Sequence, residues 1–439
     1  MTGSVDAPFT PPERWFWSLP LLVLLAWFPI APYWASDDFF ALHWAKDFEH
    51  VLADFHGPWY GAKDLFFFYR PLITLSLWLE LQVAGSDPFL AHLDNVLVHA
   101  ASALLVALLW RRWLSNTFAF AAGLVFGLSP IHIGAIGWAI ARTDGFSCAL
   151  ALLSTLLLVR HLEGRQRTRT GSLVAFGLAL LCKETVLCLP GLLFVIAFVL
   201  ANTEALPQRT KSALRAIWPH AVLLGIYLGW RLLLLGRLGG YEAAVYQPLA
   251  MAKGLFDYTL SLLNPLHWSP PFGDATASED WRAVVDRALQ RYHLAWLGLL
   301  PFALAIVRCL RQRRAFALAA MAAWFLLASV PMAGFFAQSD NAHNLRYFCL
   351  AFAGLSGVLV IGGRIAVAIA LCSAAAVLVR VRVEQFTADS QSRAMHGKLV
   401  SQLGERDLPG PWFVAGLPHQ SPYGVALQLH FGIDRLLLP

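Results

Sequence analysis

The chain has 439 residues, of which 58% are hydrophobic and only 14% are charged, and its formal net charge is +6. Soluble globular proteins carry about a quarter charged residues, so this composition excludes that class. Apolar runs long enough to span a bilayer recur between Pro20 and Arg380, whereas a membrane β-barrel would show short alternating segments. The sequence therefore predicts an all-α polytopic membrane protein. The positive charge is assigned to arginine anchors at helix ends and not to nucleic-acid binding.

The positions of arginine and lysine predict how the chain crosses the membrane. Short loops rich in these residues lie on the cytoplasmic side, so an even number of crossings must separate each pair of basic loops. These loops are residues 111–112, 160–169, 209–215 and 308–314. The condition predicts about eleven crossing helices, with a cytoplasmic N-terminus and an extracytoplasmic C-terminus. They lie near residues 15–35, 92–110, 116–130, 144–160, 171–182, 186–203, 217–235, 293–308, 315–333, 347–361 and 365–380.

Two segments are ambiguous in hydropathy, and the same condition assigns both. Residues 172–201 are interrupted by CKET and are predicted to be two short helices that turn at Lys183–Glu184 on the outer side. Residues 69–85 are predicted to lie along the outer surface as a partly amphipathic helix, within a first outer loop of residues 36–91. The predicted organisation is a transmembrane domain over residues 1–380 and a small extracytoplasmic tail over residues 381–439.

Two adjacent aspartates, Asp37 and Asp38, follow the first apolar helix in the stretch YWASDDFFAL. An ordinary pair of solvated charges that caps the next helix would explain them. A carboxylate pair held at the membrane face would instead supply a general base or a metal ligand, with the second acid fixing the first. Two like charges held close together raise one of the two pKa values, which suits a base. Both interpretations stay open, and the second is the working hypothesis.

Further polar residues lie near the predicted outer ends of helices. Charges at bilayer depth are costly and usually face a cavity or a partner. For any single arginine or lysine, an interfacial anchor or an ion pair is a sufficient explanation. Five that converge on one face would form a basic site for a phosphate group. The phosphate candidates are Lys183, Arg231 and Arg346, then Arg70 and Arg142, and the other site candidates are His132, Asp144, Glu184, His343 and Tyr347.

The sequence contains no HExxH, P-loop, GxSxG or dinucleotide glycine motif. A cytoplasmic enzyme driven by a nucleotide is therefore disfavoured, and a substrate from the membrane or the outer space is expected. A membrane transporter or lipid flippase is the main alternative, because it also lines a membrane cavity with charges. The repeated halves found in many transporters are not visible in the sequence. A non-catalytic scaffold would leave the acid pair unexplained.

Several short motifs follow one another in a fixed order. The acid pair after the first helix is followed by YRPL, NVLVH, SPIHIGAIGWAIARTD, LLCKET and LRYF. In this order they resemble the GT-C integral membrane glycosyltransferases, over roughly residues 33–348. Within that group the motifs are most similar to the protein O-mannosyltransferases, in particular to the transmembrane-and-tetratricopeptide O-mannosyltransferases.

The resemblance implies a GT-C-like fold and inverting transfer of a sugar from a polyprenyl-phosphate donor to an acceptor hydroxyl on the extracytoplasmic side. The acid pair of the family maps onto Asp37 and Asp38, its arginine–proline onto Arg70–Pro71, and its lysine–glutamate onto Lys183–Glu184. We expect Asp37 to be the general base and Asp38 to orient it or to contact the sugar. The basic residues would stabilise the departing phosphate. The sugar, the acceptor (protein, glycolipid or polysaccharide) and the need for a divalent metal stay open.

Two departures from the family pattern shape these expectations. The chain ends at Pro439 without tetratricopeptide repeats, so recognition of partners by such repeats is not expected. Related sequences tend to carry an acid in the stretch HIGAIGW, where Gly134 stands here. The short loops and the missing repeats favour an enzyme of the bacterial inner membrane.

Overall fold

The computed structural model describes residues 12–30, 34, 38–61, 67–165, 167–201, 204–238, 248–263, 280–291, 295–312, 315–336 and 342–403. Every regular element among these residues is a helix, which confirms the predicted all-α class. The α-helices are α1 (Leu19–Trp27), α2 (Asp38–Ala45), α3 (Phe48–Ala53), α4 (Pro71–Ala84), α5 (Pro88–Trp110), α6 (Asn116–Leu128), α7 (Ile133–Gly137), α8 (Arg142–Leu162), α9 (Thr168–Leu180), α10 (Leu189–Leu200), α11 (Leu206–Leu235), α12 (Pro248–Leu263), α14 (Trp281–Arg291), α15 (Ala295–Gln312), α16 (Ala315–Phe336), α17 (Cys349–Ile361) and α18 (Arg364–Leu403). The 3-10 helices are η1 (Arg14–Ser18), η2 (Trp59–Gly61), η3 (Pro130–His132), η4 (Ala139–Ala141), η5 (Glu184–Cys188) and η6 (Ala342–Phe348).

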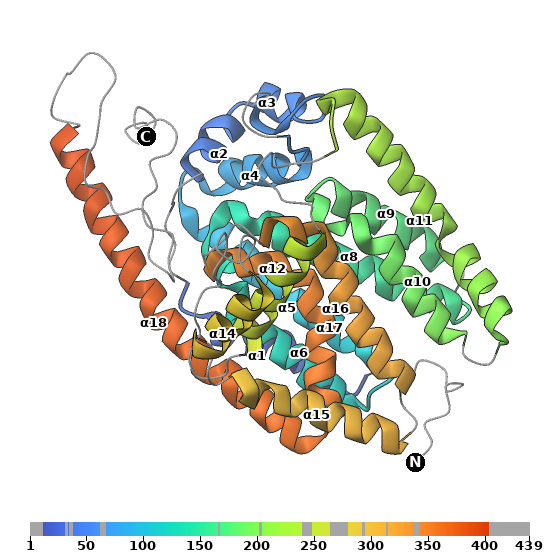
Figure 1. Ribbon diagram of the computed structural model, residues 1–439. Helices are drawn as coiled ribbons and strands as arrows, with labels where there is room; N and C mark the ends of the chain where they lie inside the picture. The colour runs from blue at the N-terminus through green and yellow to red at the C-terminus, as the bar shows by residue number, and fades with distance from the viewer. Residues whose placement is uncertain are drawn as a thin grey trace.

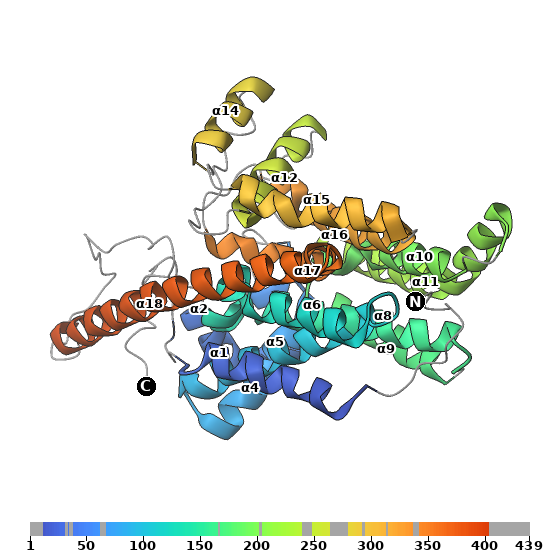
Figure 2. The same ribbon diagram turned by 90° about the horizontal axis from the view of Figure 1, so that it is seen from below.

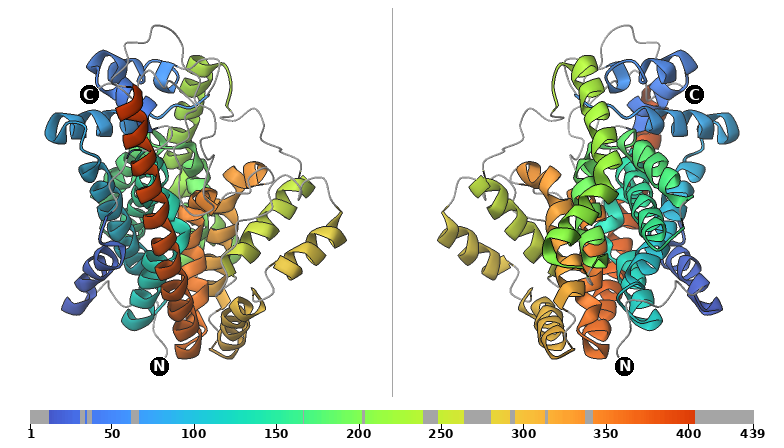
Figure 3. Two further views of the ribbon diagram at one scale, coloured as in Figure 1. Left: turned by 90° about the vertical axis from the view of Figure 1, so that its left-hand side faces the viewer. Right: turned by 90° about the vertical axis from the view of Figure 1, so that its right-hand side faces the viewer.

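The helices form a bundle in which α5, α6, α8, α16 and α17 occupy the middle (Figure 1). In this core α5 packs on α6 and α8, and α17 packs on α16 and α6. Helices α9, α10 and α11 form one flank, and α18 runs along the outside (Figures 1 and 2). Helix α12 packs on α15 and α16 at one side of the bundle, and α14 packs on α12 further out (Figure 3). Helices α2, α3 and α4 gather at one end of the bundle, at the top of Figure 1, and there they contact one another.

Local sequence signals set where the helices around that end begin. Helix α4 begins with Pro71 directly after Arg70, and proline suits this position because its missing N–H is not needed in the first helical turn. Helix α5 begins with Pro88, and the Asp87 side chain caps it by accepting a hydrogen bond from the Phe89 N–H (2.9 Å). These signals fix where α4 and α5 begin.

The central helices approach closely at small residues. A Cβ atom on Gly123 of α6 would lie 2.6 Å from the carbonyl oxygen of Ala103 in α5 and 2.6 Å from a methyl group of Leu19 in α1. A Cβ atom on Gly354 of α17 would lie 2.5 Å from the carbonyl oxygen of Met321 in α16. Membrane helices associate through such residues because their backbones can then come into van der Waals contact. The two glycines therefore allow α6 to pack closely on α5 and α17 to pack closely on α16.

The described helices fit a chain that crosses a membrane several times. Five segments are long and apolar enough to cross, and α6 together with the bent continuation through η3 and α7 would make a sixth. The five are Pro88–Trp110, Ala139–Leu162, Leu206–Leu235, Ala315–Met332 and Arg364–Val383. Each of the eleven predicted crossings contains a helix, but several are shorter, such as α1 with 9 residues. The predicted number of eleven is therefore not confirmed.

The two ambiguous segments are helical on the predicted pattern. Helices α9 and α10 are separate, and the chain breaks between them at Lys183–Glu184. Residues Pro71–Ala84 form α4, which packs on α2 and α3, so the described part of the predicted outer loop contains helices as predicted. The expected domain boundary at residue 380 lies within α18, and the remainder of the expected tail, residues 404–439, lies outside the described residues.

Candidate functional site

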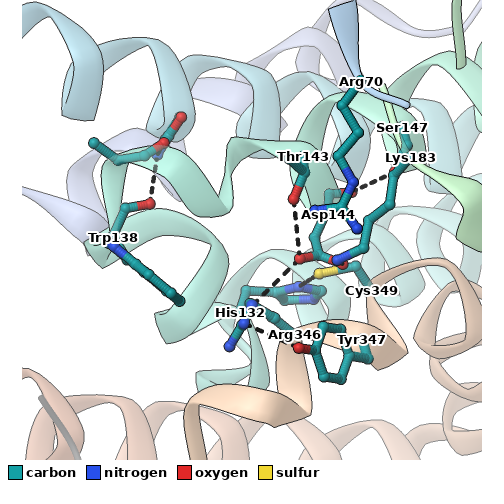
Figure 4. Close-up of polar contacts among 12 residues, drawn as sticks. Arg70, His132, Trp138, Thr143, Asp144, Ser147, Lys183, Arg346, Tyr347 and Cys349 are labelled. Atoms are coloured by element: carbon teal, nitrogen blue, oxygen red, sulfur yellow. Dashed lines mark hydrogen bonds and ion pairs between the residues drawn. The ribbon is translucent and has the colours of Figure 1, made fainter. Parts of the chain in front are cut away.

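Four segments that are far apart in the sequence meet beside the start of α8 (Figure 4). They are the residues before α4, the first turn of α8, the link between α9 and η5, and η6. Asp144 lies in the first turn of α8. The Leu72 N–H donates to the carbonyl oxygen of Leu181 (3.4 Å), which joins the start of α4 to the end of α9. This link brings Arg70 beside the residues that follow α9.

Ion pairs connect these segments. The Lys183 Nζ atom lies 2.6 Å from Asp144 Oδ1, and the Arg346 Nε atom lies 3.4 Å from Asp144 Oδ2. Arg70 donates to both carboxylate oxygens of Glu184, at 2.5 Å and 3.2 Å. Lys183 and Asp144 are each only 3% exposed, whereas Glu184 is 14% exposed. The network is therefore largely removed from solvent.

Aromatic rings surround the cations of this network. The Lys183 Nζ atom lies 4.5 Å from the ring centre of Tyr347, and the Arg346 guanidinium lies 4.6 Å from the same ring. Arg346 also lies 4.9 Å from the ring centre of Trp138 and donates to the Tyr347 hydroxyl (3.1 Å). Desolvated contacts of this kind hold a cation in a fixed position. Arg346 and Tyr347, both predicted from the sequence, therefore lie beside Lys183 and Asp144.

Arg231 approaches the network from α11. Its side chain is fully buried and donates to the Phe67 carbonyl oxygen (2.6 Å) and to the Tyr227 hydroxyl (3.3 Å). Its Nε atom is buried without a hydrogen-bond partner among the described residues. Burial alone would raise the pKa of the Glu184 carboxyl, but the positive charges of Arg70 and Arg231 outweigh it and lower that pKa to about 2. The Glu184 carboxylate is therefore ionised between cations.

Cations outnumber carboxylates among the described side chains of the network, with four cations and two carboxylates. Cations gathered in a desolvated site attract an anion strongly. The cations are Arg70, Lys183, Arg231 and Arg346, and the carboxylates are Asp144 and Glu184. The arrangement can bind a phosphate, because charge-assisted hydrogen bonds from arginine and lysine are the usual means of holding one.

Arg142, the fifth phosphate candidate, makes different contacts. Its guanidinium forms an ion pair with Glu80 of α4 through both terminal nitrogens. It also donates to Ser76 Oγ (3.1 Å) and to the Ala91 carbonyl oxygen (3.2 Å). These contacts join α8 to α4 and α5. They do not include either carboxylate of the network.

The predicted acid pair is described only in part. Asp37 lies outside the described residues. Asp38 is buried, and its Oδ1 atom accepts a hydrogen bond from the Ile140 N–H (2.8 Å), which joins the start of α2 to η4. Ile140 follows Trp138, whose ring packs on Arg346. The segment from Trp138 to Ile140 thus contacts both Asp38, through the Ile140 N–H, and Arg346 of the cation network, through the Trp138 ring.

Two histidines were also predicted to belong to the site. His132 is buried, with its Nδ1 atom 3.1 Å from Cys349 Sγ and its Nε2 atom without a partner among the described residues. Its ring packs against His99 and Phe126, both at 4.4 Å between ring centres. His343 lies in η6, but its side chain is outside the described part. No three His, Cys, Asp or Glu side chains of the described residues lie close enough to hold a metal ion.

Sequence reasoning missed the residues that pack on Arg70. The Arg70 guanidinium carbon lies 4.8 Å from the ring centre of Trp59 and 3.9 Å from that of Phe68. Asp54, which is fully buried nearby, was also not predicted. The aromatic run FFFYR directly before Pro71 was the available signal, because a buried arginine that follows several rings commonly stacks on one of them.

Comparison with known proteins gives a match to part of the chain. The family model for dolichyl-phosphate-mannose-protein mannosyltransferase matches residues 70–229. The matched segment begins at Arg70 and contains Asp144, Lys183 and Glu184. It ends before Arg231 and Arg346. No solved structure matches the chain.

Similar curated proteins are animal O-mannosyltransferases. The protein O-mannosyl-transferase Tmtc1 of Drosophila melanogaster is 32% identical over 228 residues, which are 47% of this chain and 25% of that protein. The protein O-mannosyl-transferase TMTC2 of Mus musculus is 31% identical over 210 residues, 44% of this chain and 25% of that protein. TMTC2 of Homo sapiens is 36% identical over 140 residues, 30% of this chain and 17% of that protein. The chain thus spans a quarter or less of the length of these relatives. The part of the chain that supplies both carboxylates and two cations of the network is similar to the protein O-mannosyltransferases, which confirms the resemblance predicted from the ordered motifs.

Proposed function

We propose that the protein is a membrane glycosyltransferase. It would move a sugar from a polyprenyl-phosphate donor to an acceptor hydroxyl on the extracytoplasmic side of the membrane. The observation that carries the proposal is the buried network in which four cations face two carboxylates. It is supported by the match of residues 70–229 to the mannosyltransferase family, since this segment contributes Arg70, Lys183 and both acids.

The network suits the chemistry of such a donor. When the bond between the sugar carbon and the phosphate oxygen breaks, negative charge develops on the departing phosphate. Preorganised cations in a desolvated site stabilise that charge without reorganising, which lowers the barrier. In the proposed arrangement Lys183, Arg231 and Arg346 contact the phosphate. Arg70 lies beside them and is held by Glu184.

A general base must take the proton from the acceptor hydroxyl on the face of the sugar opposite the phosphate. We assign this role to Asp37, and inversion at the sugar carbon follows from attack on that face. Asp38 would orient it. The hydrogen bond from the Ile140 N–H to Asp38 supports this division, because a carboxylate committed to a backbone N–H is suited to fixing the chain and less suited to exchanging protons.

The acceptor and the location belong to the same proposal. The names of the animal relatives describe transfer to protein, and a protein, glycolipid or polysaccharide hydroxyl is compatible with the proposed chemistry. We place the enzyme in the bacterial inner membrane with its N-terminus in the cytoplasm. The four short basic loops of the chain support this orientation.

Transfer from labelled dolichyl-phosphate-mannose by the purified protein in lipid nanodiscs tests the proposal. We expect Lys183→Met and Arg346→Gln each to lower the rate by about 10²- to 10³-fold, the loss typical when one donor to a developing oxyanion is removed. Arg209→Gln is the matched control, because Arg209 is also buried, lies at the end of α11 away from Arg231, and donates to the Phe198 carbonyl oxygen of α10. Equal rates for wild type, Lys183→Met and Arg346→Gln would remove the network from the mechanism.

The role of the acid pair needs a separate measurement. We expect Asp37→Asn to abolish transfer while the affinity for dolichyl phosphate stays within about threefold of wild type. Full activity of Asp37→Asn would exclude it as the base. A wild-type protein that moves the lipid-linked sugar across a vesicle membrane, but transfers no sugar to any acceptor, would establish the flippase alternative and overturn the proposal.

A further inference from the structure

Asp54 is a buried carboxylate in the first outer loop, directly after α3. It accepts hydrogen bonds from the Tyr60 N–H (2.9 Å), the Trp44 indole N–H (3.2 Å) and the Thr74 hydroxyl (2.5 Å). All three donors are neutral. A carboxylate is seldom fully buried, and His50 is the charged group close enough to act on this one. This unusual placement needs an explanation, and the direction of its hydrogen bonds provides one.

A chain of two hydrogen bonds with a fixed direction leads from Trp59 through Thr74 to Asp54. The indole N–H of Trp59 donates to Thr74 Oγ (3.1 Å), and the Thr74 hydroxyl donates to Asp54 Oδ2 (2.5 Å). A hydroxyl has a single hydrogen to donate. Because Thr74 uses it on Asp54, its oxygen is oriented to accept from Trp59. The Asp54 carboxylate therefore determines where the indole ring of Trp59 lies.

The same carboxylate holds a turn of unusual conformation. Tyr60 has a φ of 58°, which is uncommon for a residue other than glycine, and its N–H is held by Asp54. Its ring stacks on that of Trp59 with 4.1 Å between ring centres. The backbone N–H of Trp59 donates to the carbonyl oxygen of Phe68 (2.9 Å). The turn therefore also fixes the backbone that leads to Arg70.

The rings held in this way lie against a cation of the network. The guanidinium carbon of Arg70 lies 4.8 Å from the Trp59 ring centre and 3.9 Å from that of Phe68, while its nitrogens bind Glu184. The rings restrict Arg70 on one side and the carboxylate restricts it on the other. Arg70 and Thr74 lie at the start of the same helix, α4. The hydrogen-bond chain and the cation thus form one rigid unit.

We propose that Asp54 is a positioning residue for the phosphate site. Acting through Thr74, it sets the Trp59 ring that holds the Arg70 guanidinium in place. Asp54 itself contacts neither donor nor acceptor. This inference rests on the proposed function, and it adds Arg70 to the cations that bind the lipid-linked phosphate there. It extends the site to a loop that lies outside the segment matched by the mannosyltransferase family.

Binding of radiolabelled dolichyl phosphate to the full-length protein in nanodiscs tests the proposal. Thr74→Val keeps the size of the side chain and removes the central link. We expect it to raise the Kd by about 5- to 30-fold, which corresponds to the loss of a desolvated cation–ring contact. Thr74→Ser restores the hydroxyl and is expected to bind within about twofold of wild type. Asp47→Asn is the matched control in the same loop, because Asp47 is exposed and asparagine caps α3 equally well.

Two further variants make the outcome decisive. Trp59→Phe keeps a ring and removes only the indole donor, and we expect a Kd increase of the same direction even if Thr74→Val fails to fold. Wild-type affinity in Thr74→Val and Trp59→Phe, together with at least tenfold weaker binding by Arg70→Gln, would overturn the positioning role and leave the phosphate site intact. Wild-type affinity in Arg70→Gln as well would overturn the assignment of Arg70 to the phosphate site, on which this inference rests.

Discussion

Replacing Lys183 by methionine removes the positive charge from a buried ion pair while keeping the length of the side chain. Lys183 and Asp144 are each 3% exposed, and their charged atoms are 2.6 Å apart. Removal of one partner from such a pair costs about 3–5 kcal/mol, because the other charge stays buried. Arg346 still lies 3.4 Å from the second oxygen of Asp144, so we expect the lower end of this range, about 3 kcal/mol.

A double-mutant cycle in mixed micelles measures this coupling. The free energy of unfolding is determined by denaturant titration for wild type, Lys183→Met, Asp144→Leu and the double variant. We expect the double variant to lose less stability than the two single variants together, with a coupling energy of about 2 kcal/mol. Changes that add to within about 0.5 kcal/mol would show that the two side chains do not interact. The argument for a buried charge network around Asp144 would then be wrong.

Three other predictions concern pH and packing. Lys183 lies between two of the predicted crossings. Its burial lowers the pKa of its ammonium group to about 8, although the negative charge of Asp144 acts in the opposite direction. We therefore expect the Kd of dolichyl phosphate to rise above pH 8 in the wild type, with no such rise in Lys183→Met. In the outer loop, burial raises the pKa of Asp54 from 3.8 to about 7, so the folded state holds this proton more tightly than the unfolded chain. The contribution of Asp54 to stability is then full below about pH 4 and is lost as the pH rises to 7, and melting curves of Asp54→Asn should lack that decline. Finally, Gly123→Ala forces a contact of 2.6 Å on a backbone oxygen and should lower the free energy of unfolding by about 1–3 kcal/mol, whereas Gly225→Ala, with open space at its Cβ, should not.

The helical class and the core of the network could be predicted because both follow from the cost of placing groups in a membrane. Apolar runs must be helical in lipid, and charged residues at helix ends must find partners. Lys183 and Arg346 were therefore expected to converge, and they do converge on Asp144. Hydropathy does not report where a helix stops. Helix α1 ends at Trp27 because Phe28 precedes a proline and takes an extended conformation. This helix therefore ends well before residue 35, where the predicted crossing ends.

The contacts that depend on tertiary packing could not be predicted in the same way. The sequence did not reveal that Glu80 would form an ion pair with the Arg142 guanidinium, because the two residues lie in different helices. The role of Asp54 was hidden for a similar reason. It depends on Thr74, which lies 20 residues further along the chain, and on a turn in which Tyr60 as well as the glycine after it has a positive φ.

The four buried cations of the network also bear on turnover. A lipid-linked sugar phosphodiester carries one negative charge, whereas the phosphate monoester left after transfer carries up to two near neutral pH. Under the proposed function, these four cations thus attract the product lipid more strongly than the donor. The product should therefore bind more tightly, and its release should limit the rate. The turnover rate of such an enzyme would then depend on how quickly the polyprenyl-phosphate product leaves the site and diffuses into the surrounding membrane.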